Sequence, residues 1–273
     1  MRISLLRKIY PSLDNGMKNI KWRKLTDKEL DLSMNQYQVI ANCYDEAVRF
    51  SLLNTKQGRE MIKSRIKIER DAVIDPSYKT KLNIKGKEEV YRATKADYYG
   101  KGICADIYNN YRYADGYIRP PRLSIGVSCA IQKMINKHPS MKPFSSKIYM
   151  LGLIKNRACE FNKPSNAFRW FTGKEPIAIG EKGINISLKK HKDEVKTLLQ
   201  ELSETSCDDY SFVAVSGYKK YKDIHRWHCL PIIGINKETQ ELKLLDKHDF
   251  SETDVPFDEF IKNFKAIVGV KHK

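Results

Sequence analysis

Residues 227–246 read Trp-His-Cys-Leu-Pro-Ile-Ile-Gly-Ile-Asn-Lys-Glu-Thr-Gln-Glu-Leu-Lys-Leu-Leu-Asp, two apolar runs separated by a polar turn. The pattern predicts antiparallel strands at about 227–235 and 241–246, joined as a hairpin. Pro231 cannot donate a hydrogen bond to a neighbouring strand, which indicates a sheet edge or a bulge at that point.

This hairpin would bring two polar side chains together. If its turn is centred on Lys237 or Glu238, His228 and Asp246 share one face of the sheet, opposite each other directly or diagonally. A register that differs by one residue would put Asp246 on the other face. A carboxylate beside an imidazole holds the ring in the orientation that a general base needs.

A helix predicted early in the chain carries a cysteine at its start. Asn42 is suited to be the N-cap, Cys43 follows it directly, and Asp45 lies in the first turn. We expect this helix to end between Asn54 and Gly58. Its buried face would consist of apolar residues at helical spacing, namely Tyr44, Ala47, Val48 and Leu52.

The other patterns place most helices early in the chain and most strands late. This order is typical of an α+β fold. We expect an irregular junction at 137–165, helices at 59–70, 123–136, 188–202 and 257–264, a hairpin at 78–94, and strands at 211–216 and 266–270.

Composition narrows the function classes. The chain has 273 residues, 41% hydrophobic and 30% charged, as in soluble globular proteins, with a net charge of +17. Acidic proteins or peptides, or an anionic membrane surface, fit that charge. Nucleic acid is not a predicted partner, because no nucleic-acid motif accompanies the basic residues. Six scattered cysteines without a Cys-x-x-Cys pair predict no metal site, and we expect no cofactor.

The predicted location follows from two further features. No apolar run is long enough to span a bilayer, and the N-terminal apolar stretch is too short for a secretory signal. We therefore expect a cytoplasmic protein or an effector secreted without a cleavable signal peptide, with a bacterial effector as one hypothesis.

The order of these motifs resembles that of papain-like cysteine proteases. Asn-Cys43-Tyr at a helix start, after a lead containing glutamines, resembles their Gln…Cys-Trp segment. His228 followed six residues later by Gly234 resembles their His-Ala-x-x-x-x-Gly-Tyr strand, and Leu-Leu-Asp246 stands where they have an orienting Asn. Residues 166–173 and 255–264 resemble segments of the calpain catalytic core.

The resemblance spans about residues 34–268 and implies a two-lobe α+β fold. It implies a helical lobe that carries the cysteine and a lobe with an antiparallel β-sheet that carries the histidine. The boundaries we expect are a basic N-terminal arm at 1–30 and a protease domain at 31–268, with a Cys lobe at about 31–150 and a His lobe at about 151–268.

The resemblance also implies a mechanism, that of a cysteine endopeptidase with an acyl-thioester intermediate. Cys43 would attack the scissile carbonyl, His228 would act as base and then as acid, and Asp246 would orient His228. A glutamine before the cysteine donates to the oxyanion in this family; Gln38 is the candidate here and Gln36 its rival.

Several residues depart from the family pattern. Tyr44 replaces the usual Trp, and Asp246 replaces Asn without the Trp-Gly that follows it, so Asp249 is a reserve candidate. His225 is a rival base. The acidic loops by which calpain cores bind calcium are not recognisable.

Two other functions remain open at this point. The same triad serves transglutaminases, deamidases and acyltransferases, because the cleft decides whether water or an amine accepts the acyl group. The chain could also be an inactive, protease-like binding module.

Overall fold

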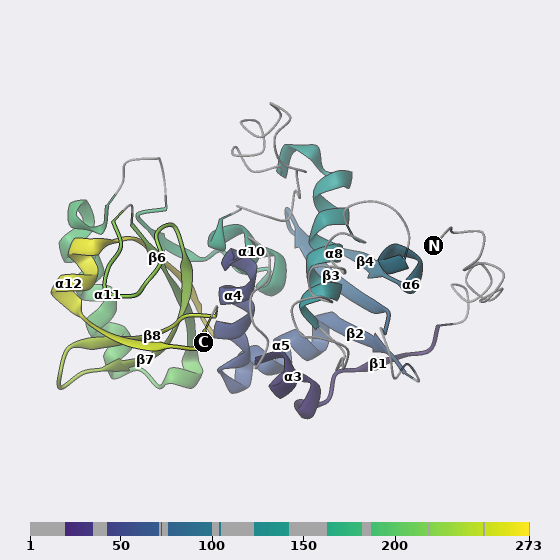
Figure 1. Cartoon of the computed structure of the whole chain (residues 1–273), viewed down its shortest axis with the longest axis horizontal. Coiled ribbons are helices and arrows are strands. Elements are labelled where there is room, and N and C mark those ends of the chain that lie inside the picture. The colour runs from purple at the N-terminus through teal and green to yellow at the C-terminus, as the bar shows by residue number, and fades with distance from the viewer. Residues whose placement is uncertain are drawn as a thin grey trace. The chain divides into compact units, whose positions relative to one another are not determined.

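The computed structural model of the chain describes two compact units (Figure 1). The first comprises residues 1–35, 63–82 and 88–159, and the second comprises 36–62, 83–87 and 160–273. The residues whose structure is described are 20–34, 43–70, 72, 76–99, 104, 123–141, 163–181, 187–217, 219–247 and 249–272.

The first unit contains a four-stranded sheet with the order β1-β2-β3-β4. The hairpin predicted at 78–94 is confirmed as β3 and β4, and Lys85 and Gly86 at its turn both have positive φ, 51° and 83°. Such a two-residue turn matches the twist of paired strands. The strands are β1 (Trp22–Lys24), β2 (Ile66–Glu69), β3 (Tyr78–Ile84) and β4 (Lys87–Ala93).

One helix prediction in this region was wrong in its second half. Helix α5 (Lys56–Arg65) ends where β2 begins, whereas we expected a helix through Arg70. Ile66 and Ile68 are buried and the residues that follow each are half-buried, which is the two-residue period of a strand. Residues 22–24, which we had expected within the N-terminal arm, form β1 and pair with β2.

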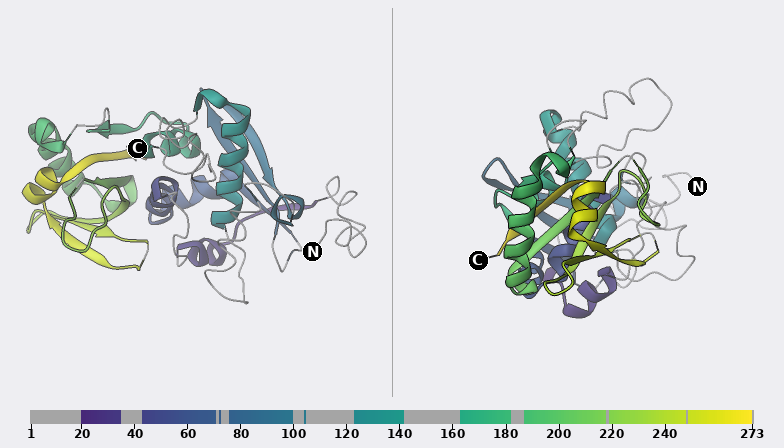
Figure 2. Two further views of the ribbon diagram at one scale, coloured as in Figure 1. Left: turned by 45° about the horizontal axis from the view of Figure 1, so that its top comes forward. Right: turned by 90° about the vertical axis from the view of Figure 1, so that its left-hand side faces the viewer.

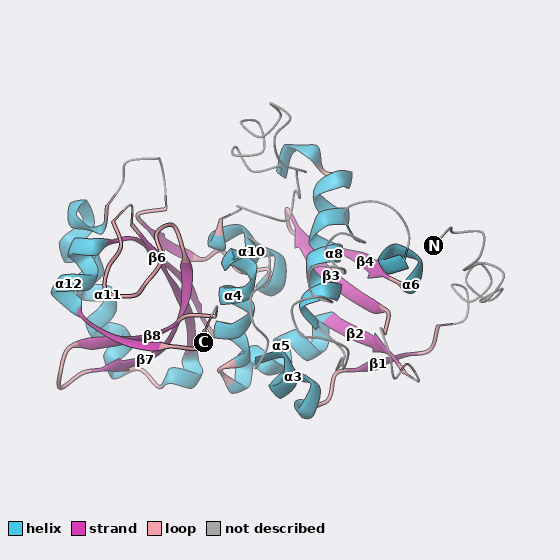
Figure 3. Cartoon of the chain, in the orientation of Figure 1, coloured by secondary structure: helices cyan, strands magenta, loops and turns pink. Residues whose placement is uncertain are grey.

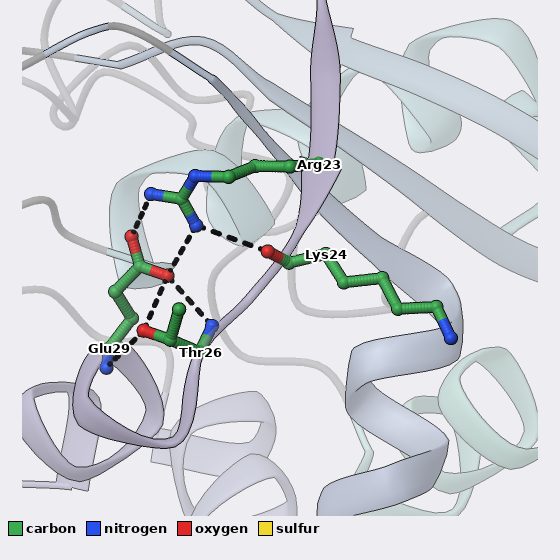
Figure 4. A network of polar contacts seen from close by, with 4 residues as sticks. All are labelled: Arg23, Lys24, Thr26 and Glu29. Atoms are coloured by element: carbon green, nitrogen blue, oxygen red, sulfur yellow. Dashed lines mark hydrogen bonds and ion pairs between the residues drawn. The ribbon is translucent and has the colours of Figure 1, made fainter.

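Helix α3 (Asp27–Met34) begins with a capping box (Figure 4). The N–H of Glu29 donates to Thr26 Oγ1 at 3.3 Å, and the N–H of Thr26 donates to Glu29 Oε2 at 2.8 Å. Each side chain therefore satisfies a backbone donor of the other residue. Arg23 holds the same carboxylate with two bonds of 2.7 and 2.8 Å, which ties β1 to the helix start.

Helix α8 (Leu123–Lys137) packs against the sheet of the first unit (Figure 3). It confirms the helix predicted at 123–136. A Cβ atom at Gly126 would lie 2.3 Å from the ring of Tyr78 in β3, so only glycine permits this close approach. The short helices α6 (Lys95–Tyr99) and η2 (Pro139–Met141) complete the described elements of this unit.

The second unit is built on a six-stranded antiparallel sheet with the order β5-β10-β6-β7-β8-β9. The α+β prediction is confirmed at this level. The strands predicted around 211–216, 227–235, 241–246 and 266–270 are present, whereas β5 and β9 were not predicted. The bounds are β5 (Ile177–Ile179), β6 (Tyr210–Ser216), β7 (Cys229–Asn236), β8 (Glu241–Leu245), β9 (Glu252–Pro256) and β10 (Phe264–Lys271).

Pro231 lies inside the sheet, not at its edge. It pairs with Val213 at the last position of the β6–β7 ladder, and the β7–β8 ladder begins one residue later, at Ile232. A residue without an N–H is tolerated there because one set of strand pairs ends as the other begins.

Helices α11 and α12 cover the sheet of the second unit (Figure 2). Their apolar residues, including Leu198, Leu199 and Phe260, join Phe212 and Leu244 of the sheet in one hydrophobic core. The predicted helix at 188–202 begins as a 3-10 turn. The bounds are α10 (Pro164–Thr172), η4 (Leu188–His191), α11 (Lys192–Glu204), η5 (Cys207–Asp209) and α12 (Phe257–Asn263).

Helix α4 (Cys43–Leu53) also belongs to the second unit, where it packs against β6, β7 and α10. It ends at Leu53, one residue before the predicted range of 54–58. Every residue after Cys43 is buried, including Asp45, Glu46 and Arg49, and the last two form an ion pair. The helix is thus enclosed by protein along its length, with only its first residue partly open.

Hydroxyl groups anchor the C-terminal end of α4. Ser211 Oγ in β6 donates to the carbonyl of Ser51 at 3.0 Å, and Thr55 Oγ1 donates to that of Leu52 at 3.1 Å. Both hydroxyls also contact Nε2 of His272, at 2.9 and 3.2 Å. The last carbonyls of a helix have no partner within the helix. In α4, the carbonyls of Ser51 and Leu52 instead accept hydrogen bonds from Ser211 of the sheet and from Thr55 just after the helix.

Candidate active site

Cys43 is the first residue of α4 and is partly exposed. A cysteine at a helix N-terminus lies where the helix dipole favours a negative charge, and this position promotes thiolate chemistry. The predicted N-cap Asn42 and the oxyanion candidates Gln38 and Gln36 lie outside the described residues.

His228 immediately precedes β7 and is buried. Its backbone is fixed by Ser216 at the end of β6: the N–H of His228 donates to Ser216 Oγ at 2.8 Å, and its carbonyl accepts from the N–H of Ser216 at 2.8 Å. Ser216 Oγ in turn donates to the carbonyl of His225 at 2.6 Å. The histidine therefore projects from a rigid point of the sheet.

The hairpin register near its turn differs by one residue from the prediction. Gly234 pairs with Lys243, so these two residues share a face. Counting in steps of two from that pair places His228 on the face of Gly234 but Asp246 on the opposite one. A regular hairpin with this turn would separate the histidine from the aspartate.

A register shift between Ile232 and Gly234 corrects the mismatch. Beyond it, Ile232 pairs with Leu244. Paired residues share a face of the sheet, and so do residues an even number of positions apart in one strand. His228 lies four residues before Ile232 and Asp246 lies two residues after Leu244, so the shift places both side chains on the same face. The bulge was expected at this strand, though at Pro231, and it is what brings the two side chains together.

Asp246 Oδ1 lies 3.2 Å from His228 Nε2, and both side chains are buried. The Cys43 thiol forms a side-chain hydrogen bond with the same imidazole. Burial lowers the pKa of His228, but the bonds to Asp246 and Cys43 outweigh it and raise the pKa to about 9. The ring is thus an imidazolium at neutral pH, with the sulfur of Cys43 and the carboxylate of Asp246 as its two partners.

The structure also places the rival residues. Asp249 is exposed, and its carboxylate accepts the N–H of Ser251 at 2.9 Å; hydrogen bonds from Ser251 lower its pKa. His225 is exposed, with its ring centre 6.4 Å from that of His228. Among the described residues, Asp246 is the carboxylate that the hydrogen bonds bring to His228. Cys229 is buried, and burial raises the pKa of its thiol well above the usual value.

Sequence reasoning missed Lys247, which follows Asp246 and is buried. Its ammonium lies 4.6 Å from the ring centre of Phe50 in α4 and 4.3 Å from that of Phe250. Burial lowers the pKa of Lys247 to about 7, an effect that Glu46 opposes and Arg49 reinforces. Lys247 therefore links the loop after Asp246 to the helix that carries Cys43. No local sequence pattern signals this burial, because it depends on a contact with a helix far earlier in the chain.

Two further observations concern the described part of the chain. Its histidine, cysteine and acidic side chains form no group of three or more suited to hold a metal ion. None of its helices has the length and apolar character needed to cross a membrane. Comparison with models of known protein families and with curated proteins gave no match.

Proposed function

We propose that the chain is a papain-like cysteine endopeptidase, with the two-lobe fold that the resemblance implies. The observation that carries the proposal is the hydrogen-bonded series Cys43–His228–Asp246, formed by residues far apart in the sequence. A thiol at a helix start, an imidazolium and a buried carboxylate are the groups that thiol catalysis requires.

In the proposed reaction, the thiolate sulfur of Cys43 attacks the carbonyl carbon of a peptide bond. The imidazolium of His228 protonates the amine nitrogen as the C–N bond breaks, which leaves an acyl-thioester and a neutral imidazole. His228 then takes a proton from water while the water oxygen attacks the thioester. The carboxylic acid leaves, and the thiolate and imidazolium are restored.

Asp246 has two roles in this scheme. Its hydrogen bond holds the ring of His228 in place, and its charge favours the imidazolium. The asparagine found at this place in papain-like proteases supplies the first effect without the second. We therefore expect His228 to hold its proton to higher pH here than an asparagine partner would allow.

Selective labelling tests the nucleophile. A peptidyl chloromethylketone should alkylate Cys43 much faster than Cys207, an exposed free cysteine of the same chain, and His228→Ala should remove the difference. The modified residue is identified by mass spectrometry of a digest. Labelling of Cys43 no faster than Cys207 would rule out the catalytic role.

Product analysis tests the reaction. Wild-type protein incubated with a protein mixture should generate new peptide termini that Cys43→Ala does not. Release of ammonia or incorporation of an added amine, without new termini, would instead assign the site to a transferase or deamidase.

A further inference from the structure

Two cysteines of the first unit lie next to each other. Cys129, in the middle of α8, is fully buried, and Cys104 is half-buried. Cys104 Sγ lies 4.0 Å from the backbone carbonyl oxygen of Cys129, and Cys129 Sγ lies 3.8 Å from that of Cys104. Because each sulfur approaches the backbone of the other residue, the two side chains point toward each other.

The two residues have the arrangement that a disulfide requires. A disulfide joins cysteines whose side chains point together and whose Cα atoms are about 4.4–6.8 Å apart. The two thiols also lie within hydrogen-bonding distance of each other. Rotation about their Cα–Cβ bonds can bring the sulfurs to bonding distance. The bond would join residues that are 25 positions apart.

The position of Cys129 is fixed by contacts on both sides of it along α8. One turn earlier, a Cβ atom at Gly126 would lie 2.3 Å from a side chain of β3, so the helix lies close against the sheet there. One turn later, Lys133 Nζ donates to the carbonyl of Arg92 in β4 at 2.7 Å and pairs with Asp97 at 2.7 Å. These contacts hold the cysteine in place on the sheet of the first unit.

The surroundings of Cys104 favour its thiolate. The hydrogen bond with the Cys129 side chain lowers the pKa of the Cys104 thiol most, burial and Asp97 oppose that effect, and Lys133 supports it, so that the pKa is lowered overall. The thiolate is the form that oxidants attack. Since Cys104 is also the more exposed of the two residues, an oxidant would reach it first.

We propose that Cys104 and Cys129 are a redox-sensitive pair, which forms a disulfide when the protein meets a hydroperoxide and thereby locks α8 to the chain at residue 104. The observation that carries the proposal is the reciprocal contact of the two cysteines. The proposal goes beyond the endopeptidase function and does not depend on it.

The oxidation takes two steps. First, the thiolate of Cys104 attacks one oxygen of the hydroperoxide: an S–O bond forms, the O–O bond breaks, and the departing oxygen takes up a proton. Cys104 is then a sulfenic acid. Next, Cys129 gives up its proton and its sulfur attacks that of Cys104: the S–S bond forms, the S–O bond breaks, and hydroxide leaves as water. The peroxide gains the two electrons that the thiols lose, and a small thiol reverses the change by exchange.

Peptide mapping of the whole chain tests the pair. Reduced Cys43→Ala protein, which lacks the candidate nucleophile, is treated with a small molar excess of hydrogen peroxide. Its remaining thiols are alkylated, and an unreduced digest is analysed by mass spectrometry. We expect peptides joined through Cys104 and Cys129 to be the main disulfide product, and dithiothreitol to separate them. The same treatment in urea should give at least about fivefold less of this product, because the fold holds the thiols together.

Single variants in the same background separate the roles of the two sulfurs. Cys104→Ser should abolish the linked peptides and leave Cys129 as a thiol. Cys129→Ala should let the sulfenic acid of Cys104 accumulate, with a dimedone adduct at least about tenfold above that of the parent, because no second thiol removes it. The control, Cys207→Ser, removes an exposed cysteine of the second unit and should leave the linked product unchanged. A thermal melt checks that each variant is folded.

Hydrogen exchange measures the lock itself. The amides of α8 should exchange at least about tenfold more slowly in the oxidised parent than in the reduced one, because the cross-link opposes local opening of the helix. Peroxide should not slow this exchange in Cys104→Ser.

Three outcomes would overturn the proposal: a main disulfide product between other cysteines, as much of the Cys104–Cys129 product in urea as in the folded protein, or exchange in α8 that oxidation does not slow. None of these readouts uses peptide cleavage. Failure of the protease proposal would therefore leave the redox pair standing, and failure of the pair would leave the protease proposal standing.

Discussion

The two ends of helix α4 each lie near a histidine, and the two histidines behave in opposite ways. At the N-terminal end, His228 contacts Asp246 and the Cys43 thiol, and its pKa rises to about 9. At the C-terminal end, Nε2 of His272 contacts two hydroxyl groups, and burial, then Lys174, lowers its pKa. The partners of the ring, more than burial alone, decide whether the histidine is charged.

The hydroxyl contacts also fix the tautomer of His272. Ser211 and Thr55 each give their single proton to a carbonyl of α4, so Nε2 of His272 must donate to them. Its Nδ1 is buried without a hydrogen-bond partner among the described residues. Protonation would create a buried N–H with nowhere to donate, so this ring anchors the helix as a neutral group. We therefore expect a catalytic histidine at one end of α4 and a structural histidine at the other.

The largest effect should come from removing the charged ring. His228→Ala should lower kcat/KM for peptide hydrolysis by about 10²–10⁴-fold, because the proton transfer that it performs contributes this much. His272→Gln, which keeps an N–H donor near Ser211, should change kcat/KM by less than about threefold. A similar loss of kcat/KM in both variants would contradict the proposed difference between the two ends of α4.

Asp246→Asn should shift the pH profile. The wild-type rate should fall as pH rises through about 9, where His228 loses its proton. Asparagine keeps an oxygen acceptor but removes the negative charge, so the alkaline limb of kcat/KM should move to lower pH. Asp246→Ala, which also removes the acceptor, should reduce the maximum rate further. If the alkaline limb of kcat/KM lay at the same pH in Asp246→Asn as in the wild type, the carboxylate would not set the charge of His228.

Lys247→Met should stabilise the protein at low pH. The lysine has a folded pKa of about 7 against about 10.4 in an unfolded chain, so its charge opposes folding fully below pH 7 and not at all above about pH 10.4. We expect a gain of about 1 kcal/mol at pH 6, after loss of the cation–ring contacts, that disappears by pH 10. Urea unfolding at the two pH values measures it; destabilisation at pH 6 would show that the ring contacts outweigh desolvation.

The smallest effect concerns the acid side of the stability curve. Because folding lowers the pKa of His272, its neutral form stabilises the protein above about pH 6.5, and this contribution falls as pH drops below that value. His228 works in the other direction: its contribution is complete below about pH 6.5 and is lost as pH rises through about 9. His272→Gln should therefore flatten the acid limb of the unfolding free energy, by less than the change in Lys247→Met, and leave the alkaline limb in place.

Local sequence patterns predicted the elements that carry the site. The apolar spacing after Cys43 predicted α4, and the two apolar runs around the turn at 237–240 predicted β7 and β8. Parity along those strands pointed to Asp246, because residues of one face alternate in any strand. That inference assumed a strand pairing that differs by one residue from the pairing found next to the turn.

What the sequence could not supply was set by tertiary packing. The register shift near Ile233 depends on how β7 is held between β6 and β8, which no local pattern records. Lys247 is buried through contacts with Phe50, nearly two hundred residues earlier in the chain. The short strands β5 and β9 were missed because three to five residues carry too little periodicity.

An NMR titration of the His228 imidazole tests the account most directly. With the ring assigned by comparison with His228→Ala, its resonances should titrate near pH 9, and Cys43→Ala should lower that midpoint because one of the groups that raise it is gone. A midpoint near 6.5, unchanged in Cys43→Ala, would mean that the ring does not lie between the thiol and the carboxylate, and would contradict the proposed site.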